Sequence, residues 1–81
     1  MLFYKSKVRF TFMFIMKNRL KELRKEKGIQ QEDLAEAMDV SRQTIISLEN
    51  GRYNPSIMLA FKLAEFFDLL IEDVFIYEGD D

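Results

Sequence analysis

The chain contains no cysteine and no histidine. Without cysteine it cannot build a disulfide framework or a thiolate metal site. Without histidine it lacks the usual ligand of zinc sites and the usual base of acid–base and triad catalysis. Its clustered carboxylates fall on expected helix surfaces, with no nucleophile, metal-binding set or phosphate loop beside them. We therefore expect no catalytic residue, no metal and no cofactor, and we do not expect an enzyme.

Long hydrophobic runs are also missing. The most apolar stretch, residues 10–16, is interrupted by Thr11 and is far shorter than the roughly 20 residues that span a bilayer. It continues into Lys17-Asn18-Arg19 without a small-residue cleavage site, which argues against a secretory signal peptide. We therefore expect a cytoplasmic protein with no membrane partner. No feature of the sequence suggests a small-molecule effector.

What the chain does contain is hydrophobic residues, which make up 48% of its 81 positions and include eight phenylalanines. This composition excludes a disordered chain, and the length is that of one domain. The net charge of −2 is unevenly distributed: residues 1–30 carry nine lysines and arginines against two glutamates, and residues 31–81 carry three against twelve acids. The acidic total predicts weak non-specific affinity for DNA. It does not prevent DNA binding where the basic groups share a face.

Hydrophobic periodicity predicts an all-α domain within residues 16–77. Helices are expected over residues 17–27, 31–38, 41–50, 56–67 and 71–74, with Gly28 and Gly51 at helix ends. Residues 1–15 form an N-terminal extension, and residues 78–81 are an acidic tail. Within the extension, residues 8–14 alternate between apolar and other side chains, which predicts a β-strand. Residues 75–77 are apolar and could form a second strand.

The helix expected over residues 41–50 has a polar face suited to nucleic acid. Ser41 is a good N-cap, and Ile45 and Leu48 can face the core together. No outward position is acidic. The outward side chains are chemically suited to base edges and phosphates: Arg42, Gln43, Thr44 and Ser47. Ile46, off the core face, could meet a thymine methyl. With the preceding helix over residues 31–38 and a tight turn, this is a helix-turn-helix arrangement.

Several linked segments carry a resemblance to one family. They are Gly28-Ile29-Gln30-Gln31-Glu32-Asp33-Leu34-Ala35, Val40-Ser41-Arg42-Gln43-Thr44-Ile45, Leu48-Glu49-Asn50-Gly51-Arg52 and Asn54-Pro55-Ser56. In this order and spacing the chain resembles a helix-turn-helix regulator of the Cro/phage-repressor type, also called the xenobiotic-response-element family. The resemblance runs from about residue 16 to about residue 75. It implies a five-helix lambda-repressor-like DNA-binding domain whose partner is double-stranded DNA.

Four positions depart from the family pattern. Asp39 and Asp68 stand where the family usually has glycine, and aspartate tolerates the left-handed turn better than most residues. Gln30 and Leu70 stand where the family usually has serine or threonine. They are poor N-caps, so we expect two helix starts to be weakened without a change of fold.

The resemblance and the residue chemistry together assign the DNA contacts. We expect contacts to bases from Arg42, Gln43, Ser47 and Ile46. The family places backbone contacts at Gln31, Asn50 and Arg52, and the hydroxyls of Ser41 and Thr44 are suited to phosphates. By resemblance, Arg24 pairs with Glu49 and ties the first helix to the third.

The helix expected over residues 56–67 is apolar nearly all round, which indicates burial on more than one side. One stripe holds Ile57, Ala60, Phe61, Ala64 and Phe67, while other faces carry Met58, Leu59, Leu63 and Phe66. A four- or five-helix domain has only one hydrophobic core, which can bury only one side of this helix. A second partner is therefore implied for the other side, either residues 1–15 or another subunit. We expect a homodimer whose interface uses both ends of the chain: Phe10, Phe12, Phe14, Met58, Phe66, Phe75 and Tyr77. Whether the terminal strands pair within or between chains is left open.

Three functions fit the sequence. The first is a sequence-specific DNA-binding transcriptional regulator that acts as a homodimer, with repression as the default for so short a chain. The second is an antitoxin-type protein of the same fold, which binds its operator and also masks a toxin. The third is a protein-interaction module that no longer binds DNA. The retained polar residues Gln31, Arg42, Gln43, Asn50 and Arg52 argue against the third.

Overall fold

The computed structural model describes residues 17–52 and 54–76 of the chain. These residues form five helices and two short strands: β1 (Lys17–Asn18), α1 (Leu20–Lys27), α2 (Gln31–Met38), α3 (Arg42–Glu49), α4 (Ile57–Phe66), α5 (Ile71–Val74) and β2 (Phe75–Ile76). The expected five-helix, mostly α-helical domain is confirmed. Among the described helices, none is long and apolar enough to cross a bilayer. The strand predicted over residues 8–14 lies outside the described part of the chain.

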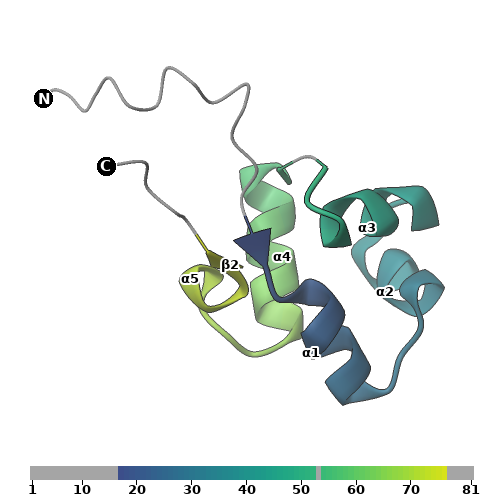
Figure 1. Ribbon diagram of the computed structural model, residues 1–81, viewed down its shortest axis with the longest axis horizontal. Coiled ribbons are helices and arrows are strands. Elements are labelled where there is room, and N and C mark those ends of the chain that lie inside the picture. The colour runs from purple at the N-terminus through teal and green to yellow at the C-terminus, as the bar shows by residue number, and fades with distance from the viewer. Residues whose placement is uncertain (1–16, 53, 77–81) are drawn as a thin grey trace, which may run out of the picture.

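The helices enclose one hydrophobic core. In Figure 1, α4 stands in the middle, α2 and α3 lie to one side of it, α1 lies below, and α5 with β2 lies on the other side. Each helix contributes buried apolar side chains, and the largest fully buried ones are Leu20, Leu34, Ile45, Leu48, Leu63 and Val74. The inward positions predicted for the helix over residues 41–50, Ile45 and Leu48, are therefore the observed ones. Packing against this core holds α3 in place and leaves the outer face of α3 accessible to solvent.

The helix ends follow the local chemistry of their residues. Ser41 and Ser56 cap α3 and α4, each accepting at 3.1 Å from the backbone N–H three residues on. Gln30 and Leu70 make no such side-chain bond, as expected. Instead the carboxylates of Asp33 and Asp73 accept from the backbone N–H groups of Gln30 and Leu70, at 2.8 and 3.2 Å. This is half of a capping box, so the weak caps are partly compensated.

Two aspartates adopt the left-handed backbone conformation that glycine usually supplies. Asp39, the C-cap of α2, has φ 61°, and Asp68, which follows the C-cap of α4, has φ 58°. Asp39 closes α2, and its backbone N–H donates to the Glu36 carbonyl oxygen. The expectation that aspartate would tolerate these turns is confirmed.

The two described ends of the chain pair as a small antiparallel sheet. Lys17 is opposite Ile76, and Asn18 is opposite Phe75. The first helix was expected to begin at Lys17 but begins at Leu20, because the backbone of the preceding residues pairs with β2 instead. The strand expected over residues 75–77 is formed by Phe75–Ile76, while Tyr77 lies outside the described residues. The described terminal strands therefore pair within one chain.

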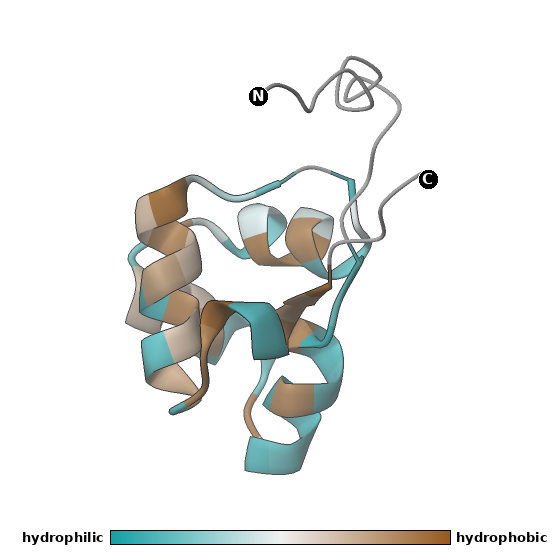
Figure 2. Cartoon of the chain, turned by 90° about the vertical axis from the view of Figure 1, so that its left-hand side faces the viewer, coloured by the Kyte–Doolittle hydropathy of each residue, from teal (hydrophilic) through white to brown (hydrophobic). Residues whose placement is uncertain are grey.

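The orientation of α4 corrects the predicted stripe. Leu59, Ala60, Leu63 and Ala64 are buried, whereas Ile57 and Phe61 are 76% and 60% exposed. The prediction was wrong for Ile57 and Phe61 because α4 has apolar residues on several faces, and Figure 2 shows hydrophobic residues along most of its length. Two apolar stripes of α4 overlap at Ala60 and Ala64. The stripe that packs into the core is the one that also contains Leu59 and Leu63.

Two members of the predicted dimer surface also contact their own chain. Phe75 is only 5% exposed and belongs to the core, so its side chain is already covered within its own chain. Phe66 is half-buried, with its ring edge-on to Phe67 at 5.0 Å between centroids, and Lys27 Nζ lies 5.5 Å from its centre. Met58, by contrast, is 71% exposed. Phe10, Phe12, Phe14 and Tyr77 lie outside the described residues.

Candidate nucleic-acid interface

A tight turn joins α2 to α3 and sets their relative orientation. After the left-handed Asp39, the Val40 N–H donates to the Ala35 carbonyl oxygen at 3.0 Å, and Val40 packs against the core. Ser41 then begins α3. Its hydroxyl lies 2.8 Å from that of Thr44, and it accepts from the Thr44 N–H. The turn and the cap therefore fix the start of α3.

The outer face of α3 is polar and contains no acid. Ile45 and Leu48 are fully buried, so the helix turns the opposite side to solvent. Arg42 and Gln43 are exposed there, and Ile46 and Ser47 are partly exposed. Gln43 Nε2 lies 3.4 Å from Ser47 Oγ, at the long limit of a hydrogen bond. The structure thus brings together the side chains predicted to contact bases: Arg42, Gln43, Ile46 and Ser47.

The single acid of α3, Glu49, points inward to a buried ion pair. Its Oε2 accepts from Arg24 Nε at 2.7 Å, and the two side chains are only 1% and 8% exposed. Arg24 also donates to the Ile29 carbonyl oxygen at 2.9 Å, and no buried side-chain polar atom among the described residues is left without a partner. The pair expected from the family resemblance is formed, and it removes the only negative charge of α3 from the outer face.

Gln31 belongs to the same network. Its Nε2 donates to Glu49 Oε1 at 3.1 Å. A side-chain amide nitrogen has two hydrogens, so this bond leaves one N–H of Gln31 able to donate elsewhere. Because Gln31 is the first residue of α2, its amide lies at a helix N-terminus, where anions are favoured.

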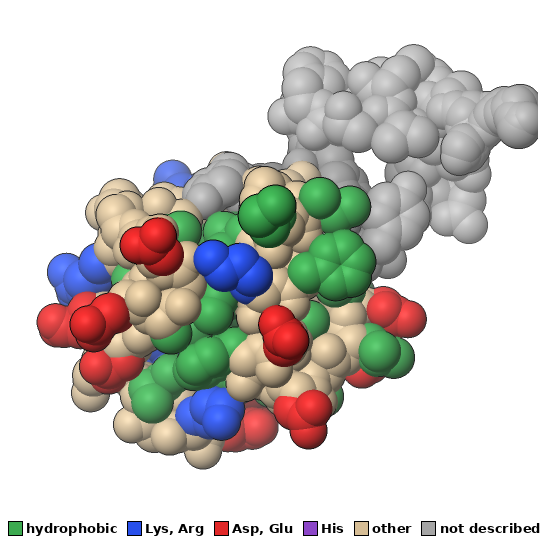
Figure 3. Space-filling model, turned by 180° about the vertical axis from the view of Figure 1, so that it is seen from behind, with side chains coloured by type: hydrophobic (Ala, Val, Ile, Leu, Met, Phe, Trp, Pro, Cys, Tyr) green, Lys and Arg blue, Asp and Glu red, His purple; other side chains and the backbone are tan. Residues whose placement is uncertain are grey.

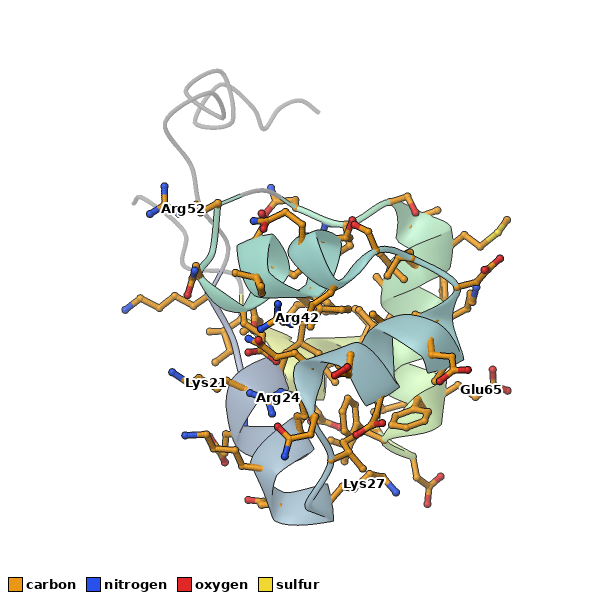
Figure 4. All side chains as sticks on the ribbon, turned by 90° about the vertical axis from the view of Figure 1, so that its right-hand side faces the viewer. Lys21, Arg24, Lys27, Arg42, Arg52 and Glu65 are labelled. Atoms are coloured by element: carbon orange, nitrogen blue, oxygen red, sulfur yellow. The ribbon has the colours of Figure 1, made fainter. Side chains whose placement is uncertain are left out.

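The chain leaves α3 through a compact loop. The N–H groups of Asn50, Gly51 and Arg52 donate to carbonyls of the last helical turn at 2.9–3.0 Å, and Gly51 has φ 70°. The side chains of Asn50 and Arg52 are exposed. Figure 4 shows Arg52 and Lys21 projecting from the same side of the molecule, with Glu65 on the opposite side. Basic groups from α1 and from this loop therefore share one side.

One residue of this region was not anticipated from the sequence. Asn18 in β1 donates from its side-chain amide to the Leu48 carbonyl oxygen at 2.8 Å, across 30 residues of sequence. The only sequence signal was an asparagine near the start of the helix expected over residues 17–27, which suggests a local role at a helix start and not a contact with α3.

An exposed ion pair lies at the start of α1. Arg19 Nη2 contacts Glu22 Oε2 at 2.9 Å, and Arg19 Nη1 donates to the Asp73 carbonyl oxygen at 3.3 Å. The hydrogen bond and the charge of Arg19 lower the pKa of Glu22. Whatever stability this pair adds is therefore present at neutral pH and is lost as the pH falls through the lowered pKa of Glu22. The contribution is small because both groups are solvated.

Comparison with known proteins identifies the family. A helix-turn-helix family model matches residues 20–74. An uncharacterized HTH-type transcriptional regulator from Methanocaldococcus jannaschii is 58% identical over 66 residues, which cover 82% of this chain and 100% of that protein. Another from Methanothermobacter thermautotrophicus is 50% identical over 66 residues, covering 80% of this chain and 96% of that protein. The crystal structure of the restriction-modification controller protein C.AhdI from Aeromonas hydrophila matches with a TM-score of 0.62 at 36% identity, over 68% of this chain and 83% of that one. The chain therefore belongs to the helix-turn-helix family of transcriptional regulators.

Proposed function

We propose that this protein is a sequence-specific DNA-binding repressor that works as a homodimer and inserts α3 into the major groove. The observation that carries the proposal is the outer face of α3, where Arg42, Gln43 and Ser47 are accessible and no acid is present. Arginine pairs with guanine, glutamine with adenine, and serine with either. Bound over a promoter, such a dimer represses by blocking polymerase.

Contacts to the DNA backbone are proposed to set the register of α3. Asn50 and Arg52 are exposed at the C-terminal end of the helix, and Ser41 and Thr44 present hydroxyls near its start. Gln31 contributes its second amide N–H while Glu49 holds the first. Contacts of this kind position the protein without selecting a sequence.

The proposed dimer uses the exposed apolar face of α4 and the turn before α5. Its members are large hydrophobic side chains that are 60–76% exposed: Ile57, Met58, Phe61 and Leu70. Figure 3 shows hydrophobic side chains gathered on this side of the molecule. We propose a second copy of the chain as the occupant, because a two-fold dimer covers the same patch on both subunits. It also presents two copies of α3 to half-sites about 34 Å apart, one turn of DNA.

Selection of bound sequences from a random pool of double-stranded DNA tests this function. We expect the full-length protein to enrich one short palindrome, because two identical helices would contact two identical half-sites. Enrichment of a non-palindromic site would argue against the homodimer. A pool that remains random after repeated rounds would contradict sequence-specific binding and leave a protein-interaction module as the better description.

Arg52→Ala should weaken binding to the selected site and to random DNA by similar factors. Arg52 is proposed to neutralise one phosphate, so the slope of log affinity against log salt should fall by about one unit. Fluorescence anisotropy across a salt series measures both quantities. Lys27→Ala is the matched control, since Lys27 lies at the opposite end of the molecule from Arg52 in Figure 4. Loss of binding to the selected site alone would show that Arg52 contacts a base.

A further inference from the structure

The side-chain amide of Asn18 joins three parts of the fold through two hydrogen bonds. Its Nδ2 donates to the Leu48 carbonyl oxygen at 2.8 Å, and its Oδ1 accepts from the Leu20 N–H at 3.0 Å. Because one partner is an acceptor and the other a donor, a single orientation of the amide satisfies both. Asn18 lies in β1 opposite Phe75. One half-buried side chain therefore connects the sheet, the start of α1 and the end of α3.

The Leu48 carbonyl lies in the last turn of α3, where carbonyl oxygens lack partners within the helix. It also accepts from the Gly51 N–H at 3.0 Å, so both of its lone pairs are used. The loop that begins at this point carries Asn50 and Arg52. Asn18 is thus bonded to the place where α3 passes into the proposed backbone-binding loop.

We infer that Asn18 is a positioning residue, which holds the C-terminal end of α3 and the following loop in the arrangement needed to contact the DNA backbone. The effect of Asn18 on DNA binding rests on the proposed function. The hydrogen bond by which Asn18 holds the end of α3 is a property of the free protein. Asn18 acts through α3 and need not touch DNA. The position requires a donor and an acceptor on one short side chain, which is a property of asparagine.

Two substitutions separate the bond to α3 from the bond to α1. Asn18→Asp has nearly the same shape and keeps an acceptor for the Leu20 N–H, but it has no donor for Leu48. Asn18→Ser also keeps a short acceptor, adds no charge and is too short to reach Leu48. An effect shared by both variants therefore comes from the lost bond to α3. An effect of Asn18→Asp alone comes from the new negative charge.

The first measurement uses the free protein. Amide hydrogen exchange followed by NMR should show that both variants speed exchange at Gly51 and Arg52 about three- to tenfold, the effect of one partly buried hydrogen bond. Exchange at Leu34 and Ala35 in α2 should not change. Wild-type exchange at the loop in Asn18→Ser would overturn the inference. A uniform increase throughout the helices would also overturn it, because that result indicates global destabilisation.

The second measurement uses the DNA site that the wild-type protein selects. Both variants should bind it about three- to tenfold more weakly while keeping the same base preferences, since the N-terminal part of α3 is held by the turn after α2. Unchanged affinity together with faster loop exchange would show that the constraint does not serve DNA binding. If the wild-type protein selects no DNA, the proposed function fails, and the exchange measurement still decides whether Asn18 holds the end of α3.

Discussion

Arg24→Met should destabilise the protein by about 3–5 kcal/mol, because it leaves the buried Glu49 carboxylate without its ionic partner. Glu49 is 1% exposed, so water cannot replace the lost guanidinium. The substitution also removes the donor to the Ile29 carbonyl. Small domains have only about 5–15 kcal/mol of stability, so this loss is a large fraction of the total. Urea unfolding followed by circular dichroism measures it.

The double variant Arg24→Met/Glu49→Leu should be more stable than Arg24→Met alone. With both charges removed, no uncompensated charge remains in the core. Glu22→Gln is the matched control, since it breaks an ion pair of similar length that is open to solvent. It should change the free energy of unfolding very little. Strictly additive losses in the double-mutant cycle would mean that Arg24 and Glu49 are not coupled, contrary to their geometry.

Phe61→Lys should convert the proposed dimer to a monomer at micromolar concentration. Phe61 is 60% exposed, so the substitution should not disturb the fold of the single chain. In a two-fold interface it would place two new charges in an apolar contact. Affinity for a palindromic site should then fall about 10²–10⁴-fold, because the two half-sites are no longer contacted by one linked unit. Sedimentation measures the mass, and anisotropy measures the affinity.

Two variants show which surface forms the interface. Ala37→Lys adds the same charge at an exposed position of α2 and should leave the dimer intact. Phe12→Lys tests the N-terminal extension, whose residues 8–14 have the strand pattern. If Phe12→Lys abolishes the dimer and Phe61→Lys does not, the interface belongs to the extension. A monomeric wild-type protein would contradict the homodimer altogether.

The helices of this fold were predictable because each has a local signal. Ser41 and Ser56 cap their helices, Gly28 ends one, and the periodic positions of α2 and α3 are the buried ones. The rotation of α4 was not predictable, because a helix that is apolar on most sides does not show which side the core will take. The start of α1 depended on the pairing of Lys17 and Asn18 with β2 residues that lie 59 and 57 positions further along the chain, and no local pattern indicates such a pairing.

The candidate site was predictable to a similar extent. The outer face of α3 followed from periodicity and side-chain chemistry. The Arg24–Glu49 pair followed only from the family resemblance, because no local pattern links residues 25 positions apart. The bond from Gln31 to Glu49 and the bond from Asn18 to Leu48 were missed, since both depend on how helices pack after they form.

The central claim is that α3 contacts the bases, and Gln43→Ala tests it most directly. Gln43 is exposed on the outer face of α3 and lies away from the core. Wild-type and variant proteins are each used to select sites from the same random DNA pool. We expect the variant to lose preference at one position in each half-site, with a cost of about 1–3 kcal/mol there, and to keep the wild-type preference elsewhere. Identical preferences at every position of the selected site would contradict the assignment of α3 as the helix that contacts bases.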